Sequence, residues 1–404
     1  MEFTTLCYLE RDDHYLMLHR TKKEHDFNKD MWIGVGGHFE ENESPDECLL
    51  REVKEETGLT LTSYKMRGIL TFVYRDICEY VCLYTADGFE GEMTSCNEGE
   101  LKWVPKDKLL TLNLFEGDLI FFKLLLEDAP FFSLKLTYDQ VNEHRLIDAN
   151  LNGKKLELFD ILDENGVPTG LTRERSLCHL LDTPHRTGHV WIVRPVEAKD
   201  KIASDTQAGT SQNKPAYELL LQKRSHDKDS FPDCYDISSA GHVPAGSSVL
   251  DSAIRELSEE LGIKASPSDL IPIGTHEGNS HSIFYGKPFH NHEFSTLYLY
   301  TKPVQLKDLV LQESEIQSAK WFDLNQLMED VKNNAPGYCL YYDELQILKM
   351  RWKNNRRQAI TACLFKSMLN LSFFFAMVAQ ISRTILWNNL HKFIIIITLN
   401  TSIL

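Results

Sequence analysis

The sequence predicts an α+β protein that contains two copies of one domain type. Short alternating runs of apolar and polar residues, which are typical of strands, are interleaved with few helical segments. Two acid-rich segments, residues 37–59 and 241–263, align without a gap and lie about 204 residues apart. This spacing is the length of a domain and too long for a solenoid repeat, so we interpret it as a tandem duplication.

Each repeated segment is flanked by expected strands, and each copy closes with a tryptophan-containing strand followed by an amphipathic stretch. In the first copy these elements are residues 1–20 (a strand, a turn and a second strand), 68–74, 101–110 and 114–126. In the second copy they are residues 189–193, 218–223, 295–300 and 319–331. A turn at residues 163–166 predicts a hairpin, and the small polar residues 203–214 predict an exposed loop.

The polar, turn-rich residues 148–155 mark the expected domain boundary. We therefore expect a first domain at 1–147, a linker at 148–155, a second domain at 156–350 and a tail at 351–404. Residues 345–404 contain no Asp or Glu, and the apolar stretch 361–379 is interrupted by Lys366. Three interpretations of this end stay open: a membrane anchor, a helix packed on the second domain, or an aberrant extension of the reading frame. We favour an absence of membrane contact.

The composition restricts the partners. The chain has 404 residues, a formal net charge of −16, and nine cysteines that form no CxxC pair. A duplex-binding protein usually carries a basic patch, so we expect no nucleic-acid partner. The cysteines show no disulfide framework and the first residues do not resemble a signal peptide, so we expect a reduced, cytoplasmic compartment.

The first repeated segment predicts a helix with a metal site. Ser44 can cap its start, and Gly58 ends it. Glu52, Glu55 and Glu56 then lie at i, i+3 and i+4, on one face. Three converging carboxylates repel one another unless a cation lies between them, and hard oxygen ligands suit Mg²⁺ or Mn²⁺. Because Mg²⁺ commonly also binds substrate phosphates, we expect a small diphosphate or nucleotide as the substrate.

Gly37, Glu43 and the run REVKEETGL at residues 51–59 resemble the Nudix box at every defined position. The resemblance implies a mixed β-sheet between helices, with the box as loop, helix and loop. It implies hydrolysis of a nucleoside diphosphate linked to another group, by a water molecule that the metal activates. It also implies that the metal ligands are Glu52, Glu55, Glu56 and the carbonyl of Gly37, that Glu55 and Glu56 serve catalysis, and that Arg51 orients the glutamates.

The second segment resembles the same box with one departure. Its matching positions are Gly241, Arg255, Glu256, Leu257, Glu259, Glu260, Gly262 and Ile263. Ser247 stands where the first box has Glu43, a carboxylate that would support the loop and the arginine. The resemblance still implies metal binding by Glu256, Glu259 and Glu260, with Arg255, Glu259 and Glu260 in catalysis. Two interpretations stay open for this domain: an active hydrolase, or a non-catalytic module that binds a nucleotide or diphosphate.

Around the first box, the sequence is similar to 8-oxo-dGTP diphosphatases. Phe27, Trp32 and the glycine pair that ends at Gly37 have the spacing of that subgroup, and so does Glu98 followed by Trp103. The resemblance implies substrate contacts by Phe27 and Trp32. It implies that Glu98 is a further metal ligand or a base.

The segment 114–122 resembles the purine-pocket segment of the same subgroup, which implies base contacts by Glu116 and Asp118. One departure is Ile33, which stands where a base-reading asparagine can occur. The favoured substrate of the first domain is therefore an oxidised purine triphosphate such as 8-oxo-dGTP.

The second domain resembles the isopentenyl-diphosphate-isomerase-like branch of Nudix proteins, on residues 157–166, 186–193 and 219–243. True isomerases of this type have a catalytic cysteine where Ala240 stands here, and Cys234 is too far upstream to replace it. We therefore expect a hydrolase relative, and isomerase activity is the alternative that Ala240 disfavours. Glu293 and Glu315 are candidates for a further ligand or base, whereas we expect a structural role for His242.

Overall fold

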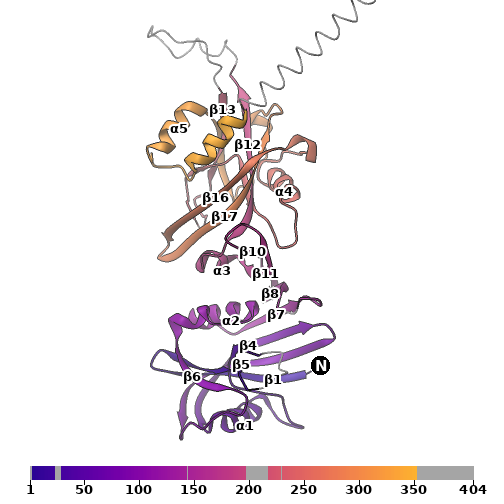
Figure 1. Cartoon of the computed structure of the whole chain (residues 1–404), viewed down its shortest axis with the longest axis vertical. Coiled ribbons are helices and arrows are strands. Elements are labelled where there is room, and N and C mark those ends of the chain that lie inside the picture. The colour runs from indigo at the N-terminus through magenta and orange to yellow at the C-terminus, as the bar shows by residue number, and fades with distance from the viewer. Residues whose placement is uncertain (1, 23–28, 143, 197–216, 229, 353–404) are drawn as a thin grey trace, which may run out of the picture. The chain divides into compact units, whose positions relative to one another are not determined.

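The computed structural model describes residues 2–22, 29–142, 144–196, 217–228 and 230–352 (Figure 1). The chain divides into a compact unit, residues 1–341, which holds both repeated segments, and a second unit from residue 342 onward. Phe27, the expected loop at 203–214 and the tail beyond residue 352 lie outside the described residues. Within the described part of the chain, no helix combines the length and apolar character that a membrane crossing requires.

A mixed nine-stranded sheet organises the first part of the chain (Figure 1). Its strands follow the order β3-β2-β1-β5-β4-β7-β8-β9, and β6 pairs with β2. They are β1 (Glu2–Arg11), β2 (His14–His19), β3 (Trp32–Ile33), β4 (Thr60–Tyr74), β5 (Ile77–Glu90), β6 (Glu100–Pro105), β7 (Phe132–Tyr138), β8 (Leu146–Leu151) and β9 (Lys154–Lys155). The pairs β1–β5 and β4–β7 are parallel. Helices α1 (Pro45–Thr57), η1 (Lys106–Thr111, a 3₁₀ helix) and α2 (Glu116–Leu126) accompany this sheet.

Helices α1 and α2 pack on opposite faces of the first sheet. Alternation along β1 separates two cores, because successive side chains of a strand point to opposite faces. Cys7 and Leu9 join Leu49 of α1 in one core. Tyr8 joins α2 in the other, where its ring centroid lies 4.7 Å from that of Phe122. Both faces of β1 are therefore buried, which confirms the predicted sheet between helices.

The expected linker at 148–155 forms part of this sheet. Leu136 of β7 pairs with Ala149 of β8, and Asn150 of β8 pairs with Lys155 of β9. The turn-rich composition that suggested a boundary reflects the β8–β9 hairpin turn, where Gly153 has φ of 79°. The domain limits stay a proposal, and the sheet favours a first domain that extends through β9.

A second mixed sheet organises the later part of the first unit, with the order β14-β13-β12-β17-β16, β15 on β12 and β18 on β13. Its strands are β12 (His185–Pro195), β13 (Tyr217–Arg224), β14 (Tyr235–Asp236), β15 (Ser239–His242), β16 (Ile271–Phe284), β17 (Lys287–Tyr300) and β18 (Ile316–Asp323). The parallel pair β12–β17 is the counterpart of β1–β5. Helices α3 (Arg175–Leu180), α4 (Val249–Leu261), η3 (Pro267–Asp269), η4 (Leu306–Asp308) and α5 (Leu324–Lys332) accompany it.

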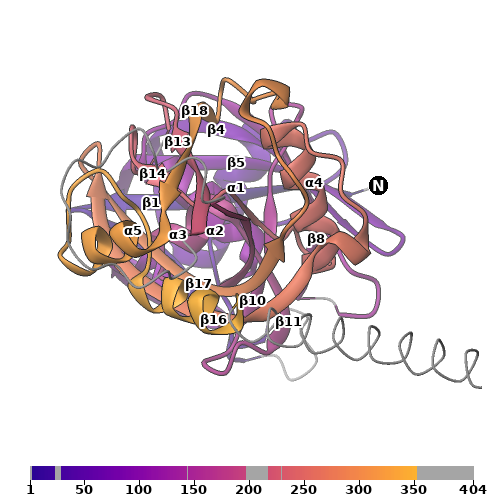
Figure 2. The same ribbon diagram turned by 90° about the horizontal axis from the view of Figure 1, so that it is seen from above.

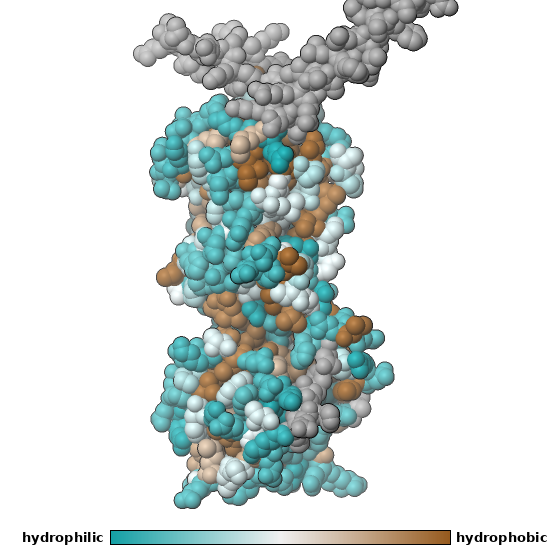
Figure 3. Space-filling model, viewed as in Figure 1, coloured by the Kyte–Doolittle hydropathy of each residue, from teal (hydrophilic) through white to brown (hydrophobic). Residues whose placement is uncertain are grey.

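Helices α4 and α5 lie on opposite sides of β13 in both ribbon views (Figures 1 and 2). A separate hairpin of β10 (Leu158–Leu162) and β11 (Pro168–Glu174) precedes this sheet. Its turn confirms the sequence prediction, since Gly166 N–H donates to the carbonyl of Asp163 at 3.0 Å. Hydrophilic side chains cover most of the face seen in Figure 3, in keeping with the acid-rich composition.

Candidate active sites

Both repeated segments form the helices that their sequences predict. Helix α1 starts after Ser44, which forms a reciprocal capping box with Glu47, and ends at Gly58, with φ of 75°. Helix α4 starts after Ser248 and ends at Gly262, with φ of 71°. Because a positive φ suits glycine, the two helices end at equivalent points. The box glutamates therefore have the same spacing relative to both ends of their helices.

A glycine lies directly against the first box glutamate of each helix. A Cβ at Gly37 would lie 2.5 Å from the carboxylate carbon of Glu52, and one at Gly241 would lie 2.3 Å from Cγ of Glu256. Neither position has room for a side chain. The carbonyl of Gly37, a predicted metal ligand, accepts a hydrogen bond from Thr5 N–H at 2.9 Å. The Cys48 thiol lies 3.6 Å from the same oxygen, so a cation bound there would replace this weak second hydrogen bond.

Arg51 connects the acidic groups of the first box. Its Nε and one terminal nitrogen donate to the two oxygens of Glu43 at 2.6 and 2.9 Å. Its other terminal nitrogen donates to Glu52 at 2.7 Å and lies 3.5 Å from Glu55. The hydrogen bonds from Arg51 lower the pKa of Glu43 to about 2. Arg51 thus contacts two of the three predicted glutamate ligands and is itself fixed by Glu43.

Three carboxylates of the first domain lie close enough to interact. Glu56 accepts a hydrogen bond from Gly36 N–H at 2.8 Å. Burial raises the pKa of Glu56 to about 7, and the negative charges of Glu98 and Glu52 add to this effect. Glu98 forms an ion pair with Arg20. The structure thus brings Glu98 to the box glutamates, whereas Glu55 is the most open of the set, with 62% of its side chain exposed.

The second box holds its arginine less firmly. Arg255 donates to Glu256 at 2.8 Å and lies 3.8 Å from Glu259. Ser247 occupies a turn, where its N–H donates to the carbonyl of Pro244 at 2.9 Å. Since no carboxylate stands at this position, Arg255 has no contact equivalent to the two hydrogen bonds between Arg51 and Glu43 in the described structure.

Glu260 is enclosed by the second domain. Burial raises its pKa to about 8, whereas hydrogen bonds with Ser239 and Gln222 act in the opposite direction. Its Oε2 is shielded from solvent and has no hydrogen-bond partner among the described residues. Buried polar atoms usually have a partner, and an ion is one of the groups that can supply it. The residues of this box therefore fit the divalent cation that their spacing predicts.

A cavity of about 460 Å³ lies over the second box. Glu256, Glu259 and Glu260 line it, together with Glu293 and Glu315, so the two additional candidate acids do face the box. Basic side chains also line the cavity, and each is paired with an acid. Arg224 lies 2.9 Å from Asp236, Arg175 lies 3.1 Å from Glu157, and Lys228 pairs with Glu315. The wall of the cavity thus presents both charges to a bound molecule.

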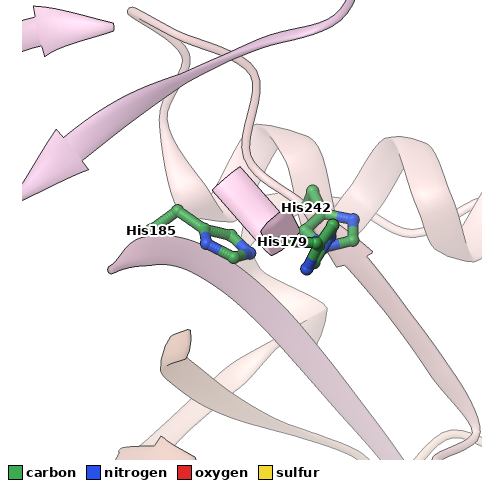
Figure 4. Close-up of side chains that lie close together, drawn as sticks. All are labelled: His179, His185 and His242. Carbon is green, nitrogen blue, oxygen red and sulfur yellow. The ribbon is translucent and has the colours of Figure 1, made fainter. Parts of the chain in front are cut away.

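Three histidines converge at one point, and one of them, His242, lines this cavity (Figure 4). One ring nitrogen from each of His179, His185 and His242 lies within 4.8 Å of the others. Nδ1 of His179 lies 3.0 Å from the carbonyl of His290, and Nδ1 of His185 lies 2.8 Å from that of Thr183. These contacts favour a proton on Nδ1 of both rings.

The environments of His185 and His242 suit neutral imidazoles. Burial lowers the pKa of His185 to about 3 and that of His242 well below its ordinary value. Nε2 of both rings is shielded from solvent and has no hydrogen-bond partner among the described residues. Glu293 Oε1 lies 3.6 Å from Nε2 of His242. These residues could hold a divalent ion that prefers nitrogen ligands, and His242, expected to be structural, belongs to the group.

The predicted substrate contacts of the first domain are only partly described. Phe27 lies outside the described residues. Trp32 stacks on His19 with ring centroids 4.4 Å apart and planes 1° from parallel. The backbone N–H of Trp32 donates to the carbonyl of Asn113 at 3.0 Å. One face of the Trp32 ring is therefore already covered by His19.

Glu116 and Asp118 have different environments at the start of α2. Both oxygens of Glu116 accept hydrogen bonds from Arg173, at 2.9 and 2.8 Å. A base contact by Glu116 would have to compete with this ion pair. Burial raises the pKa of Asp118 to about 7. No local sequence pattern indicates Arg173 as a partner, because it lies 57 residues from Glu116 along the chain.

The NUDIX domain family model matches residues 3–125 and 210–341. The chain therefore belongs to the Nudix hydrolase family and carries two Nudix domains in tandem.

Curated relatives agree with this assignment. The chain is 35% identical over 195 residues to Nudix hydrolase 3 of Arabidopsis thaliana, a match that covers 46% of this chain and only 22% of that relative. It is 36% identical over 172 residues to an uncharacterized Nudix hydrolase of Listeria monocytogenes, covering 43% of this chain and 83% of the relative. It is 29% identical over 128 residues to the oxidized purine nucleoside triphosphate hydrolase of Danio rerio, covering 31% and 82%.

Proposed function

We propose that the first domain hydrolyses an oxidised purine nucleoside triphosphate such as 8-oxo-dGTP, and that the second hydrolyses another diphosphate, each with Mg²⁺ or Mn²⁺. The observation that carries this proposal is the meeting of Glu52, Glu56 and Glu98 beside Arg51, which Glu43 holds in place. The similarity to an oxidized purine nucleoside triphosphate hydrolase supports the substrate class.

The residues of the first domain divide the work of hydrolysis. Glu52, Glu55, Glu56 and the Gly37 carbonyl are the groups that would hold the cation, which supplies activation of water and neutralisation of phosphate charge. Arg51 keeps Glu52 in position through a 2.7 Å hydrogen bond. Glu98, ion-paired with Arg20, is the base that we assign to accept a proton from the attacking water.

Asp118 is the residue to which we assign recognition of the base. With a pKa of about 7, its carboxyl is partly protonated at neutral pH. A protonated carboxyl both donates and accepts a hydrogen bond, whereas a carboxylate only accepts. An oxidised purine presents N–H and C=O groups side by side, so a carboxyl in this state can match both. Because Arg173 occupies both oxygens of Glu116, we assign Glu116 to positioning α2.

The cavity of the second domain supports a diphosphate substrate. Its acidic side, Glu256, Glu259 and Glu260, provides the cation ligands, and Arg224 and Lys228 provide positive charge on the same wall. Phosphate groups that bridge a cation and basic side chains are a recurring arrangement in enzymes that cleave phosphoanhydrides.

The test is release of phosphate and pyrophosphate from a nucleotide panel with Mg²⁺. The panel contains 8-oxo-dGTP, the normal dNTPs, ADP-ribose and NADH, and it is run on wild type, Glu55→Gln and Glu259→Gln. These substitutions are a matched pair, because they change the same position of the two boxes. If 8-oxo-dGTP is preferred and only Glu55→Gln abolishes its hydrolysis, the assignment holds. If Glu259→Gln abolishes it instead, the chemistry belongs to the second domain.

Isopentenyl-diphosphate isomerase activity is the second candidate for the second domain. Ala240 lines the cavity without a thiol, but Cys339 lines it as well. Burial raises the pKa of the Cys339 thiol well above its ordinary value, so this thiol stays protonated at neutral pH but is a weak acid. Formation of dimethylallyl diphosphate by wild type, and its loss in Cys339→Ala, would favour the isomerase. Binding of a nucleotide or diphosphate without any turnover would instead favour a non-catalytic module.

A further inference from the structure

The β16–β17 hairpin has two faces of different chemistry. Side chains alternate along a strand, so the residues of one face recur at every second position. The face toward the cavity carries Ser280, Ser282, Phe289, Asn291 and Glu293. The opposite face carries the cross-strand pairs His281 with His290 and Asn279 with His292. The imidazoles of this outer face take no part in the hydrolysis proposed above.

Asp182, in the turn between α3 and β12, meets these histidines. Its Oδ2 lies 3.6 Å from Nε2 of His281, and its Oδ1 lies 3.8 Å from Nδ1 of His292. The Nδ1 atoms of His281 and His290 are 2.8 Å apart. One potential ligand atom from each of Asp182, His281 and His290 therefore lies within 4.8 Å of the others.

Two further features of this cluster are compatible with a bound cation. Oδ1 of Asp182 is shielded from solvent and accepts no hydrogen bond from the described residues. A buried polar atom of this kind needs an explanation, and an ion provides one. The two facing Nδ1 atoms of His281 and His290 repel each other as bare lone pairs, so either a proton or a cation must lie between them.

We infer that Asp182, His281 and His290 form a site for a divalent ion of the Zn²⁺ class on the outer face of this hairpin. Two imidazoles and one carboxylate are ligands that Zn²⁺ accepts, with water in the fourth tetrahedral position. Mg²⁺ prefers oxygen ligands, so this site and the box glutamates select different ions. The inference does not depend on the function proposed above.

An ion at this position would fasten the hairpin to the turn before β12. This link between the hairpin and the turn would also affect the cavity, because the other face of the same hairpin lines the cavity. The backbone carbonyl of His290 also lies 3.0 Å from Nδ1 of His179, so the hairpin contacts the three buried histidines as well. We therefore expect the ion to raise the unfolding temperature of the chain.

The test is a Zn²⁺ titration of the full-length chain, first freed of metal with a chelator, against a chromophoric competitor and in excess Mg²⁺. Wild type is compared with His281→Gln, with the double variant His281→Gln/His290→Gln and with Asp182→Asn. His185→Gln removes one of the buried histidines and identifies any Zn²⁺ that binds there. The matched control is His226→Gln, because His226 also forms an exposed pair with an aspartate, Asp233, at 2.6 Å.

We expect the double variant to lose one equivalent of Zn²⁺, or to bind it more than about 100-fold more weakly, since even outer-shell changes typically cost 10–100-fold. His226→Gln and His185→Gln should retain this equivalent. Co²⁺ bound to wild type should show the visible absorption of a tetrahedral ion, and the double variant should lack that contribution. The inference is overturned if wild type binds no Zn²⁺, if the double variant binds as wild type does, or if His226→Gln causes the same loss.

Discussion

Arg51 and Arg255 occupy the same position of the two boxes in different surroundings. Arg51 donates hydrogen bonds to both oxygens of Glu43, and 21% of its side chain is exposed. Within the described residues, Arg255 forms ion pairs with the glutamates of its own helix, and 40% of its side chain is exposed. The caps, the terminal glycines and the glutamate spacing are nevertheless shared. A box can therefore keep its glutamate spacing while its arginine lacks the carboxylate that holds it in the other box.

The largest effect should come from neutralising the enclosed glutamate of each box, with Glu56→Gln and Glu260→Gln. We expect loss of the last ligand in each helix to remove the rise in unfolding temperature that saturating Mg²⁺ gives to that domain. In the first domain, kcat should also fall by more than about 100-fold, given the 10–100-fold cost of outer-shell changes. Calorimetry with and without Mg²⁺ is the measurement. Retention of the Mg²⁺ effect in Glu260→Gln would show that the second box binds no metal through this residue.

Glu43→Ser places the residue of the second box into the first. Arg51 then loses two hydrogen bonds, so Glu52 is positioned less firmly. We expect kcat for the preferred nucleotide to fall by roughly tenfold to 100-fold, since a shift of about 1 Å at a reacting centre can cost about 100-fold. Exposed Glu41→Ser is the control. Unchanged kcat in Glu43→Ser would show that the anchor is dispensable and would remove the main reason to doubt the second box.

Asp118→Asn tests base recognition in the first domain. The second domain has no residue assigned to this role. We expect KM for the oxidised purine to rise about tenfold, the equivalent of about 1.4 kcal/mol, with little change for normal dNTPs. Steady-state kinetics on both substrates is the measurement. Equal losses on both would contradict a role in recognition of the oxidised base.

The same substitution makes a prediction for stability against pH. The pKa of Asp118 is raised from 3.8 to about 7, so the folded chain holds a proton that the unfolded chain releases. The stabilising contribution is full below about pH 4 and is lost as pH rises toward 7. Asp118→Asn should remove this slope between pH 5 and pH 8. Identical slopes for wild type and variant would show that the carboxyl is already ionised.

The smallest effect should come from Ser247→Glu, which restores the missing anchor. Arg255 is partly exposed, so we expect a gain of at most about 1 kcal/mol in the free energy of unfolding of the second domain. A thermal midpoint about 2–4 °C higher would correspond to this gain. Adding Arg255→Lys should remove the gain if the new carboxylate acts through the guanidinium. A gain that survives Arg255→Lys would mean that the glutamate acts through another partner.

Local sequence patterns predicted those features that neighbouring residues determine. Ser44 and Gly58 set the ends of α1, and the spacing of the glutamates follows from the helix itself. The mixed sheets with packed helices were predicted correctly, and the family match confirms the tandem duplication. Glu98 was predicted near the box through a resemblance. The structure places it there because β6 pairs with β2 and its first residue, Glu100, lies opposite His19.

Features that depend on contacts between distant segments could not be predicted. His179 and His185 meet His242 because β15 pairs with β12, where Thr187 lies opposite His242. Nothing in the sequence around either residue indicates that partner. The ion pair between Glu116 and Arg173 could not be predicted for the same reason. The expected linker is a different case, since a hairpin turn inside a sheet and a domain boundary have the same polar composition.

The parallel strand pairs have a consequence for synthesis on the ribosome. Leu9 of β1 pairs with Ala86, so this ladder is complete early, whereas Ile192 of β12 pairs with Tyr300. A nascent chain therefore exposes one edge of β12 until more than a hundred further residues have emerged. Val190 and Trp191, both buried in the finished fold, remain next to that open edge throughout this interval. Open edges beside apolar side chains invite association with other chains, so β12 is open to such association for longer than β1 during translation.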